Sequence, residues 1–155
     1  MIKTNIKGIQ QVQNELAKEL KKYKEAPSVV VGIRGEAGTV DGGDITMAQL
    51  GAIHEFGTPA IPERPFLVPG VELAEPNITK AVIKYLPNDG IEKTLGKVGQ
   101  IAQSSVQNYM VDLKTPPNAP STIAKKKSSN PLIDTGALVG SITYAVTSEP
   151  LEEGL

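Results

Sequence analysis

Four prolines within thirteen residues constrain the fold of this chain more than any other sequence feature. The segment TPAIPERPFLVPG covers residues 58–70. Each proline lacks a backbone N–H and pushes the residue before it toward an extended conformation, which excludes a helix across the segment. The sequence therefore predicts a stiff, extended arm that carries Ile61, Phe66 and Leu67.

The chain's only histidine comes just before this arm. His54 stands beside Glu55, and such a pair can supply a metal ligand and a base. A metalloprotease would need a second histidine four positions later, where the chain has Thr58 and offers no other His and no Cys. The alternative of His54 as a general base with Asp134 lacks a recognisable nucleophile. The sequence thus favours a structural role and predicts no enzyme activity and no catalytic, cofactor-binding or metal-binding residues.

Composition limits the classes to which the chain can belong. Its 155 residues fit one domain, predicted over residues 1–148 with a short acidic tail at 149–155. A net charge of -1 and an apolar fraction of 39% argue against disorder and against a strongly basic nucleic-acid binder. With no cysteine, no long apolar run and no signal-peptide pattern at the start, the protein is expected in the cytosol.

The first part of the chain is predicted to contain a helix, a strand and a loop. Apolar residues recur every three or four positions from Ile2 to Tyr23, and Pro27 ends this amphipathic helix. The first 26 residues have three more positive than negative charges, and the lysine-rich other face of the helix is interpreted as a solvated face, with a phosphate or partner contact as the alternative. SVVVGI, residues 28–33, is predicted to be a strand, followed by a glycine-rich loop without a phosphate-binding signature.

Helices are predicted on both sides of the arm. A helix of about ten residues is expected to start after Thr46 or Asp44 and to stop at Gly57. After the arm, helices over residues 71–86 and 91–110 flank a turn at residues 87–90. Gly96 and Gly99 would let another backbone approach the second of these helices closely.

The last third of the chain is predicted to be an irregular connector that leads to a final strand. The segment LKTPPNAPSTIAKKKSSNPLIDTGALVGSI contains a short capped turn near Ser121 or Thr122. Asp134 or Thr135 is expected to cap a short helix that begins at Gly136. SITYAVTS then reads as a strand. The fold class is α+β: a small, mostly antiparallel sheet packed with several helices and joined by long Pro- and Gly-rich loops.

The two unusual segments together resemble a family of phage proteins. AIHEFGTPAIPERPFL, followed later by PPNAPSTIAKKKSSNPLIDTGALVGSI, is similar to the virion-morphogenesis proteins, which are the tail-completion or neck proteins of long-tailed bacteriophages and prophages. The two segments together cover about a third of the chain, and the matching residues within them are residues 54–57, 61–67, 121–123, 125–127, 131–138 and 141–142.

The resemblance implies a non-enzymatic structural protein of the virion neck. Such a protein joins the end of the tail tube to the head connector as a ring of identical subunits, expected to number six, and is present in the host cytoplasm during assembly. Double-stranded DNA would pass through the lumen, and no membrane is involved. The alternatives are a connector-side adaptor or tail terminator of the same neck, and a DNA-contacting module.

Under this hypothesis the arm is the site. Phe56, Phe66 and Leu67 would anchor the arm in the subunit's own core or in a neighbour, and Glu55 would pair with Arg64. Asp134, Thr135 and Gly136 would form a capped turn. The run Lys125, Lys126 and Lys127 is interpreted as solvated, with phosphate or DNA contact as the alternative.

Overall fold

The computed structural model describes residues 27–126 and 129–148. Residues Val29–Val146 form one compact unit, while Met1–Ser28 and Thr147–Leu155 are grouped apart from it. The amphipathic helix predicted before Pro27 and the acidic tail lie outside the described residues. The α+β prediction is confirmed, because the described residues form a two-stranded antiparallel sheet and several α-helices.

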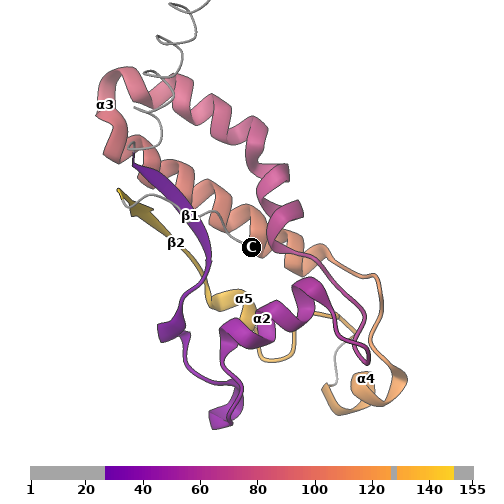
Figure 1. Cartoon of the computed structure of the whole chain (residues 1–155). Helices are drawn as coiled ribbons and strands as arrows, with labels where there is room; N and C mark the ends of the chain where they lie inside the picture. Colours follow the sequence, from indigo (N-terminus) through magenta and orange to yellow (C-terminus); the bar gives the residue numbers. More distant parts are fainter. Residues whose placement is uncertain (1–26, 127–128, 149–155) are drawn as a thin grey trace, which may run out of the picture. The chain divides into compact units, whose positions relative to one another are not determined.

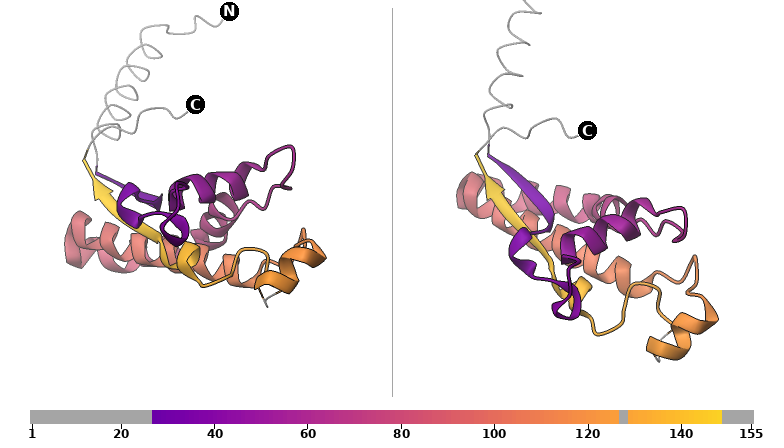
Figure 2. Two further views of the ribbon diagram at one scale, coloured as in Figure 1. Left: turned by 90° about the horizontal axis from the view of Figure 1, so that it is seen from below. Right: turned by 60° about the horizontal axis from the view of Figure 1, so that its bottom comes forward.

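The sheet joins two segments that are far apart in the sequence. Strand β1 (Ser28–Ile33) pairs with β2 (Ile142–Thr147), and both lie where the sequence predicts strands. Their β-branched residues suit a pleated, half-buried surface. Figures 1 and 2 show this pair of strands lying along one face of the long helix α3.

Helix α3 (Leu67–Asp112) is a helical hairpin that folds back on itself at one residue. Gly90 has φ 74° and ψ 174°, a conformation that only glycine adopts readily. Thr94 Oγ1 donates a hydrogen bond to the Gly90 carbonyl at 2.7 Å. The two halves of α3, before and after Gly90, are called its first and second arm, and they lie side by side in both figures. The predicted turn at residues 87–90 is therefore confined to Gly90, and Pro87 remains within the helix.

The two arms of α3 are in close contact at Gly70. A Cβ built there would lie only 2.7 Å from the Cα of Val106, so no larger residue fits. Ser105 Oγ donates to the Gly70 carbonyl at 2.7 Å across the same contact. At Gly99, where the sequence predicts the approach of another backbone, the neighbour is instead the ring of Tyr144 from β2. Gly96 faces open space.

The prediction that residues 67–70 are extended is wrong. Helix α3 begins at Leu67, so Pro69 lies in its first turn. Proline is tolerated there because the first N–H groups of a helix have no intrahelical acceptor. The arm is therefore shorter than predicted: it runs from residue 57 to residue 66, and a turn bridged by Thr58 and Ile61 interrupts the extended conformation that the sequence predicts.

Helix α2 (Met47–Phe56) begins and ends at residues that the sequence identifies. Thr46 is the N-cap: its hydroxyl accepts from Gln49 N at 3.1 Å, and Gln49 Oε1 accepts from Thr46 N at 2.9 Å. This reciprocal pair is a capping box. The glycine-rich loop before it contains two short 3₁₀ turns, η1 (Gly35–Ala37) and η2 (Val40–Gly42).

Two short helices interrupt the connector. Helix α4 (Pro120–Lys126) follows the proline-rich segment, and α5 (Ala137–Gly140) leads into β2. The prediction that Asp134 or Thr135 is the N-cap of α5 is wrong, since that residue is Gly136, with φ 85°. Thr135 still contributes, because its Oγ1 accepts from Ala137 N at 3.3 Å.

The hydrophobic core lies where α3, the end of the arm, the connector and β2 meet. Its buried members are Phe66, Val106, Met110, Leu132, Leu138 and Ile142. In the described part of the chain, no helix combines the length and the apolarity needed to cross a bilayer.

Candidate functional site

The two segments that carry the resemblance meet at the end of the α3 hairpin opposite Gly90 (Figure 1). Arg64, at the end of the arm, is the link between them. Its guanidinium is buried and donates from Nε to the Pro116 carbonyl at 2.8 Å and from Nη2 to the Pro117 carbonyl at 3.0 Å. Because these prolines begin the connector, Arg64 fixes the arm to it.

These two hydrogen bonds matter for stability because the guanidinium that donates them is buried. The Arg64 residue is only 4% exposed, and burial lowers its pKa from the ordinary value. A guanidinium nevertheless stays protonated in proteins, so a charged group is held here by backbone carbonyls. Hydrogen bonds that involve a charged donor are stronger than neutral ones, and removing this donor leaves two partly buried carbonyls without it.

Glu55, near the end of α2, fixes the same end of the arm to the start of α3. Its carboxylate accepts from the N–H groups of Phe66 at 2.7 Å, Leu67 at 2.9 Å and Val68 at 3.4 Å. These N–H groups belong to the start of α3, where helix donors lack partners and the helix dipole favours a negative charge. Glu55 therefore caps α3 from a distance of eleven residues.

The predicted pairing of Glu55 with Arg64 needs correction. Both side chains stabilise the arm, but each bonds to backbone groups rather than to the other. The physical reason is that α3 begins at Leu67. Its free N–H groups are closer partners for the carboxylate, and the proline-rich connector offers free carbonyls to the guanidinium.

The arm itself turns sharply back onto the end of α2. Gly57, with φ 69°, starts the turn, and a Cβ at this position would lie 2.8 Å from Glu63 N. Thr58 N donates to the Ile61 carbonyl at 2.8 Å, and Arg64 N donates to the His54 carbonyl at 2.6 Å. Residues 57–64 are thus a closed, hydrogen-bonded turn rather than a loose loop.

The two phenylalanines have opposite surroundings. Phe66 is 2% exposed and belongs to the hydrophobic core of the chain, and Leu67 packs against that core. Phe56 is 78% exposed at the C-terminus of α2. Ile61, at the tip of the arm, is also exposed. The arm is therefore anchored by one ring while the other ring faces solvent.

His54 lies on the inner side of the same junction. Its Nδ1 is buried and has no hydrogen-bond partner among the described residues. Burial, followed by the positive charges of Arg64 and Lys126, lowers the pKa of His54 from 6.5 to about 4. The imidazole is consequently neutral at physiological pH.

A cavity of about 270 Å³ separates α2 from the connector at this point. Its polar lining includes His54, Lys126, Asp134 and Thr135. Lys126 Nζ donates to the carbonyls of Asn130 at 3.3 Å and Pro131 at 3.4 Å. Burial lowers the pKa of Lys126, with opposing effects from Asp134, which raises it, and Arg64, which lowers it further.

The three lysines of the connector therefore do not act as one group. Lys126 bonds to the backbone of its own connector, Lys125 is exposed, and Lys127 lies outside the described residues. The structure thus offers Lys125, but not Lys126, for the phosphate contact considered from the sequence.

Sequence reasoning missed Asn130, the residue that shapes the connector. Its Oδ1 accepts from Leu132 N at 3.0 Å and Ile133 N at 3.1 Å, and its Nδ2 donates to the Val111 carbonyl at 2.7 Å. The available signal was the Asn-Pro dipeptide, which is typical of a turn. Only the structure shows that the same side chain ties this turn to the end of α3.

The contacts of this site are mostly bonds from side chains to backbone groups. Among the described residues, no group of three or more His, Cys, Asp or Glu side chains is placed to hold a metal ion. What the site does is hold a turn rigidly between two helices and the connector, with Phe56 displayed beside it. No family model, curated protein or solved structure matches this chain.

Proposed function

We propose that this protein is a structural component of the head-tail junction of a long-tailed phage. It completes the tail or forms a neck ring of identical subunits between the tail tube and the connector. The proposal rests on the resemblance of residues 54–67 and 116–142 to phage tail-completion proteins. The observation that supports it is a rigidly held arm with an exposed phenylalanine beside it.

A rigid display of apolar residues suits assembly. Binding is weakened by the entropy lost when a loop is ordered, and an arm already fixed by Arg64 and Glu55 loses little. Aromatic side chains that fill a pocket on the partner carry much of the energy of many interfaces. Phe56, 78% exposed, is placed to act in this way.

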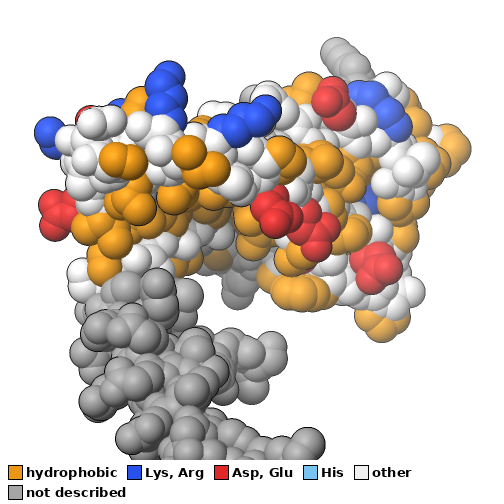
Figure 3. Space-filling model, turned by 90° about the horizontal axis from the view of Figure 1, so that it is seen from above, with side chains coloured by type: hydrophobic (Ala, Val, Ile, Leu, Met, Phe, Trp, Pro, Cys, Tyr) orange, Lys and Arg blue, Asp and Glu red, His pale blue; other side chains and the backbone are white. Residues whose placement is uncertain are grey.

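Further apolar residues reach the surface of the subunit. Figure 3 shows one face on which hydrophobic side chains are extensive, with positive and negative charges scattered among them. Exposed apolar surface of this extent is typical of proteins that bind other proteins. The exposed large apolar residues in the described part of the chain are Val30, Ile45, Phe56, Ile61, Val68, Leu73, Ile83, Leu86, Ile91, Val111 and Val146.

In the proposed setting the partners are copies of the same chain, the tail tube or its terminator, and the head connector. The expected ring has six subunits and sits in the virion neck, where DNA passes through its lumen. The DNA-contacting alternative gains no support from Lys126, because this side chain is turned toward its own connector.

Particle analysis tests this proposal. An antibody against the chain, with gold as the label, should mark the junction of head and tail in purified phage particles. Particles produced without the protein should separate into filled heads and free tails. Absence of the chain from mature particles, or its location at the distal end of the tail, would contradict the proposal.

A further inference from the structure

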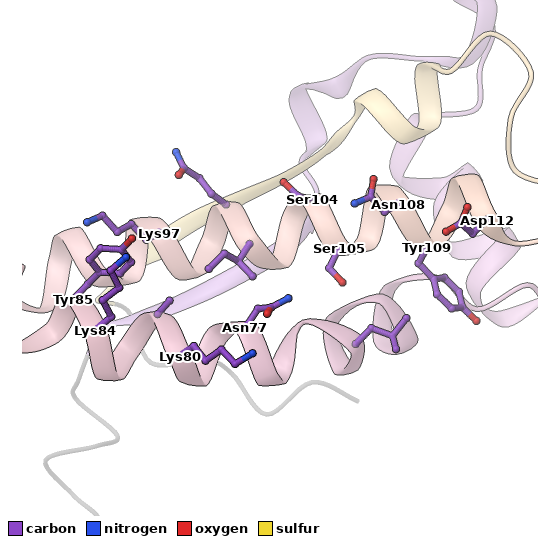
Figure 4. A pocket seen from close by; sticks show the side chains of 14 residues that line it. Asn77, Lys80, Lys84, Tyr85, Lys97, Ser104, Ser105, Asn108, Tyr109 and Asp112 are labelled. Atoms are coloured by element: carbon purple, nitrogen blue, oxygen red, sulfur yellow. The ribbon is translucent and has the colours of Figure 1, made fainter.

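A groove runs between the two halves of the α3 hairpin. Its volume is about 1060 Å³, at the upper end of the range for small-molecule pockets of about 300–1,000 Å³. Figure 4 shows that its two walls are the antiparallel halves of the α3 hairpin. The wall formed by the second arm extends from Lys97 to Asp112.

The end of the groove near Gly90 is cationic. Lys80 and Lys84 are exposed on the first arm. Lys97, on the second arm, forms an ion pair with Asp89 and lies 3.5 Å from the centre of the Tyr85 ring, while Lys84 lies 4.9 Å from that centre. The charged groups that line the groove are three lysines and, at the far end, Asp112.

The groove also offers apolar surface. Leu73, 63% exposed, lines the first arm, and Ile101 and Tyr109 line the second. Amide and hydroxyl side chains lie between them, including Asn77, which Figure 4 shows projecting into the space between the arms. A ligand that matches this lining carries negative charges together with apolar side chains, and has the length of a peptide segment.

One segment of this chain has that chemistry. Residues 149–155, EPLEEGL, contain three glutamates, two leucines and no basic residue. Seven extended residues span up to about 25 Å. The groove wall from Lys97 to Asp112 rises by about 22 Å at 1.5 Å per residue.

We infer that the groove of one subunit binds residues 149–155 of a second copy of the chain. The glutamates would meet Lys80 and Lys84, and the leucines would meet the apolar stretch around Leu73 and Ile101. The inference rests on the proposed ring, because a tail that reaches a neighbour gives a head-to-tail contact, and such contacts close into rings.

Other occupants fit the groove less well. The first 26 residues carry six lysines against three glutamates, so their charge has the same sign as that of the groove. A DNA backbone would match the lysines but would leave Leu73 and Ile101 without apolar partners. An acidic, leucine-containing segment satisfies both parts of the lining.

Peptide binding provides the first test. A fluorescent peptide of residues 148–155 should bind the full chain, and its anisotropy should fall when salt is added. Lys80→Glu with Lys84→Glu should weaken binding at least about tenfold. The matched control, Lys93→Glu with Lys125→Glu, changes the net charge equally at exposed positions outside the groove and should leave affinity within about twofold.

The peptide itself supplies a variant that needs no folding. Replacing its three glutamates with glutamine should reduce binding as strongly as the groove variant does. The inference would be overturned if the glutamine peptide bound as tightly as the glutamate peptide, or if the control protein lost as much affinity as the groove variant. It would also be overturned if the peptide did not bind while duplex DNA bound through Lys80 and Lys84.

A charge swap tests whether the tail comes from a second copy. One variant carries Glu149→Lys, Glu152→Lys and Glu153→Lys, and the other carries Lys80→Glu and Lys84→Glu. Each alone should remain at the subunit mass of 16.4 kDa at concentrations where the wild type associates, whereas an equimolar mixture should associate. A mixture that stays monomeric while a single chain with both sets of changes binds its own tail would refute exchange between copies.

These outcomes separate the inference from the proposed function. If the groove variant forms rings on tail tubes as well as the wild type does, the proposed neck function stands, and residues 149–155 are not needed for the ring. Conversely, if the peptide binds and the charge swap succeeds in a protein that never joins tubes or connectors, that result would support the groove contact and contradict the neck function.

Discussion

A buried arginine and a partly buried glutamate hold the C-terminal end of the arm. Arg64 bonds to the carbonyls of Pro116 and Pro117, and Glu55 bonds to the first N–H groups of α3. Each satisfies backbone groups that regular secondary structure leaves unpaired. At the residue scale, the arm is thus stabilised by side chains that replace missing backbone partners.

Replacing Phe66 tests the anchoring of the arm. Phe66→Ala should lower the free energy of unfolding by about 3–5 kcal/mol, because a buried ring leaves a cavity in the core. The chain's other phenylalanine is the control: Phe56→Ala, at a position 78% exposed, should change stability by no more than about 0.5 kcal/mol. Urea unfolding of the two variants measures the difference. Equal effects would contradict the assignment of Phe66 to the core.

Arg64 should not tolerate lysine. Arg64→Lys keeps the charge but cannot reach both carbonyls with a planar pair of donors. Stability should fall by about 1.5–3 kcal/mol, the range for a hydrogen bond to a charged group. The reverse exchange at an exposed site, Lys125→Arg, should leave the unfolding midpoint unchanged. A midpoint for Arg64→Lys equal to that of the wild type would show that the two proline carbonyls do not depend on the guanidinium.

Because of His54, the free energy of unfolding should decrease as the pH is lowered through the mildly acidic range. Its pKa is about 4 in the folded protein, below the ordinary value of 6.5. Above pH 6.5 both states are neutral and the residue has no effect. As the pH falls from 6.5 toward 4, the unfolded chain binds a proton that the folded chain does not, so the folded state loses stability.

The comparison uses unfolding free energies at about pH 7 and pH 5.5. His54 is the only histidine in the chain. The free energy of unfolding should therefore change less over this pH interval in His54→Gln than in the wild type. The same slope in both proteins would assign the pH dependence to carboxylates instead.

At the scale of elements, local signals in the sequence predict most boundaries. The Thr46–Gln49 capping box and Gly57 define α2, and Gly90 divides the α3 hairpin. These features act between residues close in the sequence, so the sequence alone reveals them. Pro69 shows the limit, because its place in a helix depends on where the helix starts. That start is set by Glu55 from another element.

The candidate site was predictable only in part. Proline spacing identifies the arm, and residue type identifies Phe66 and Arg64 as residues that fix it. Their partners could not be deduced, since Pro116 and Pro117 lie more than fifty residues from Arg64. Nothing local distinguishes Phe56 from Phe66 either, because burial is decided by how α2 packs against its neighbours.

Two glycines of α3 give opposite predictions. Gly90→Ala should destabilise the protein by about 1–3 kcal/mol, because φ 74° with ψ 174° is strained for any residue with a Cβ. Gly96→Ala should stabilise it by about 0.4–1 kcal/mol, since the residue is helical and faces open space. Thermal unfolding of both variants measures the two effects. A stabilised Gly90→Ala would mean that the hairpin does not bend there.

In the molecule as a whole, the residues that form the buried core differ from the apolar residues that face solvent. The core made of Phe66, Val106, Met110 and Ile142 among others lies within the single chain. Phe56 and several apolar residues of α3 remain exposed. The exposed apolar side chains are thus separate from those that hold the fold together.

The mass of the purified protein in solution, measured by light scattering with and without the tail tubes of a long-tailed phage, is the decisive test of the proposed role in the phage neck. We predict that chains of 16.4 kDa collect into one discrete ring on the tube ends. Phe56→Ser should fold normally but fail to form this ring. A protein that stays monomeric and binds neither tubes nor connectors at any concentration would contradict a role in the phage neck.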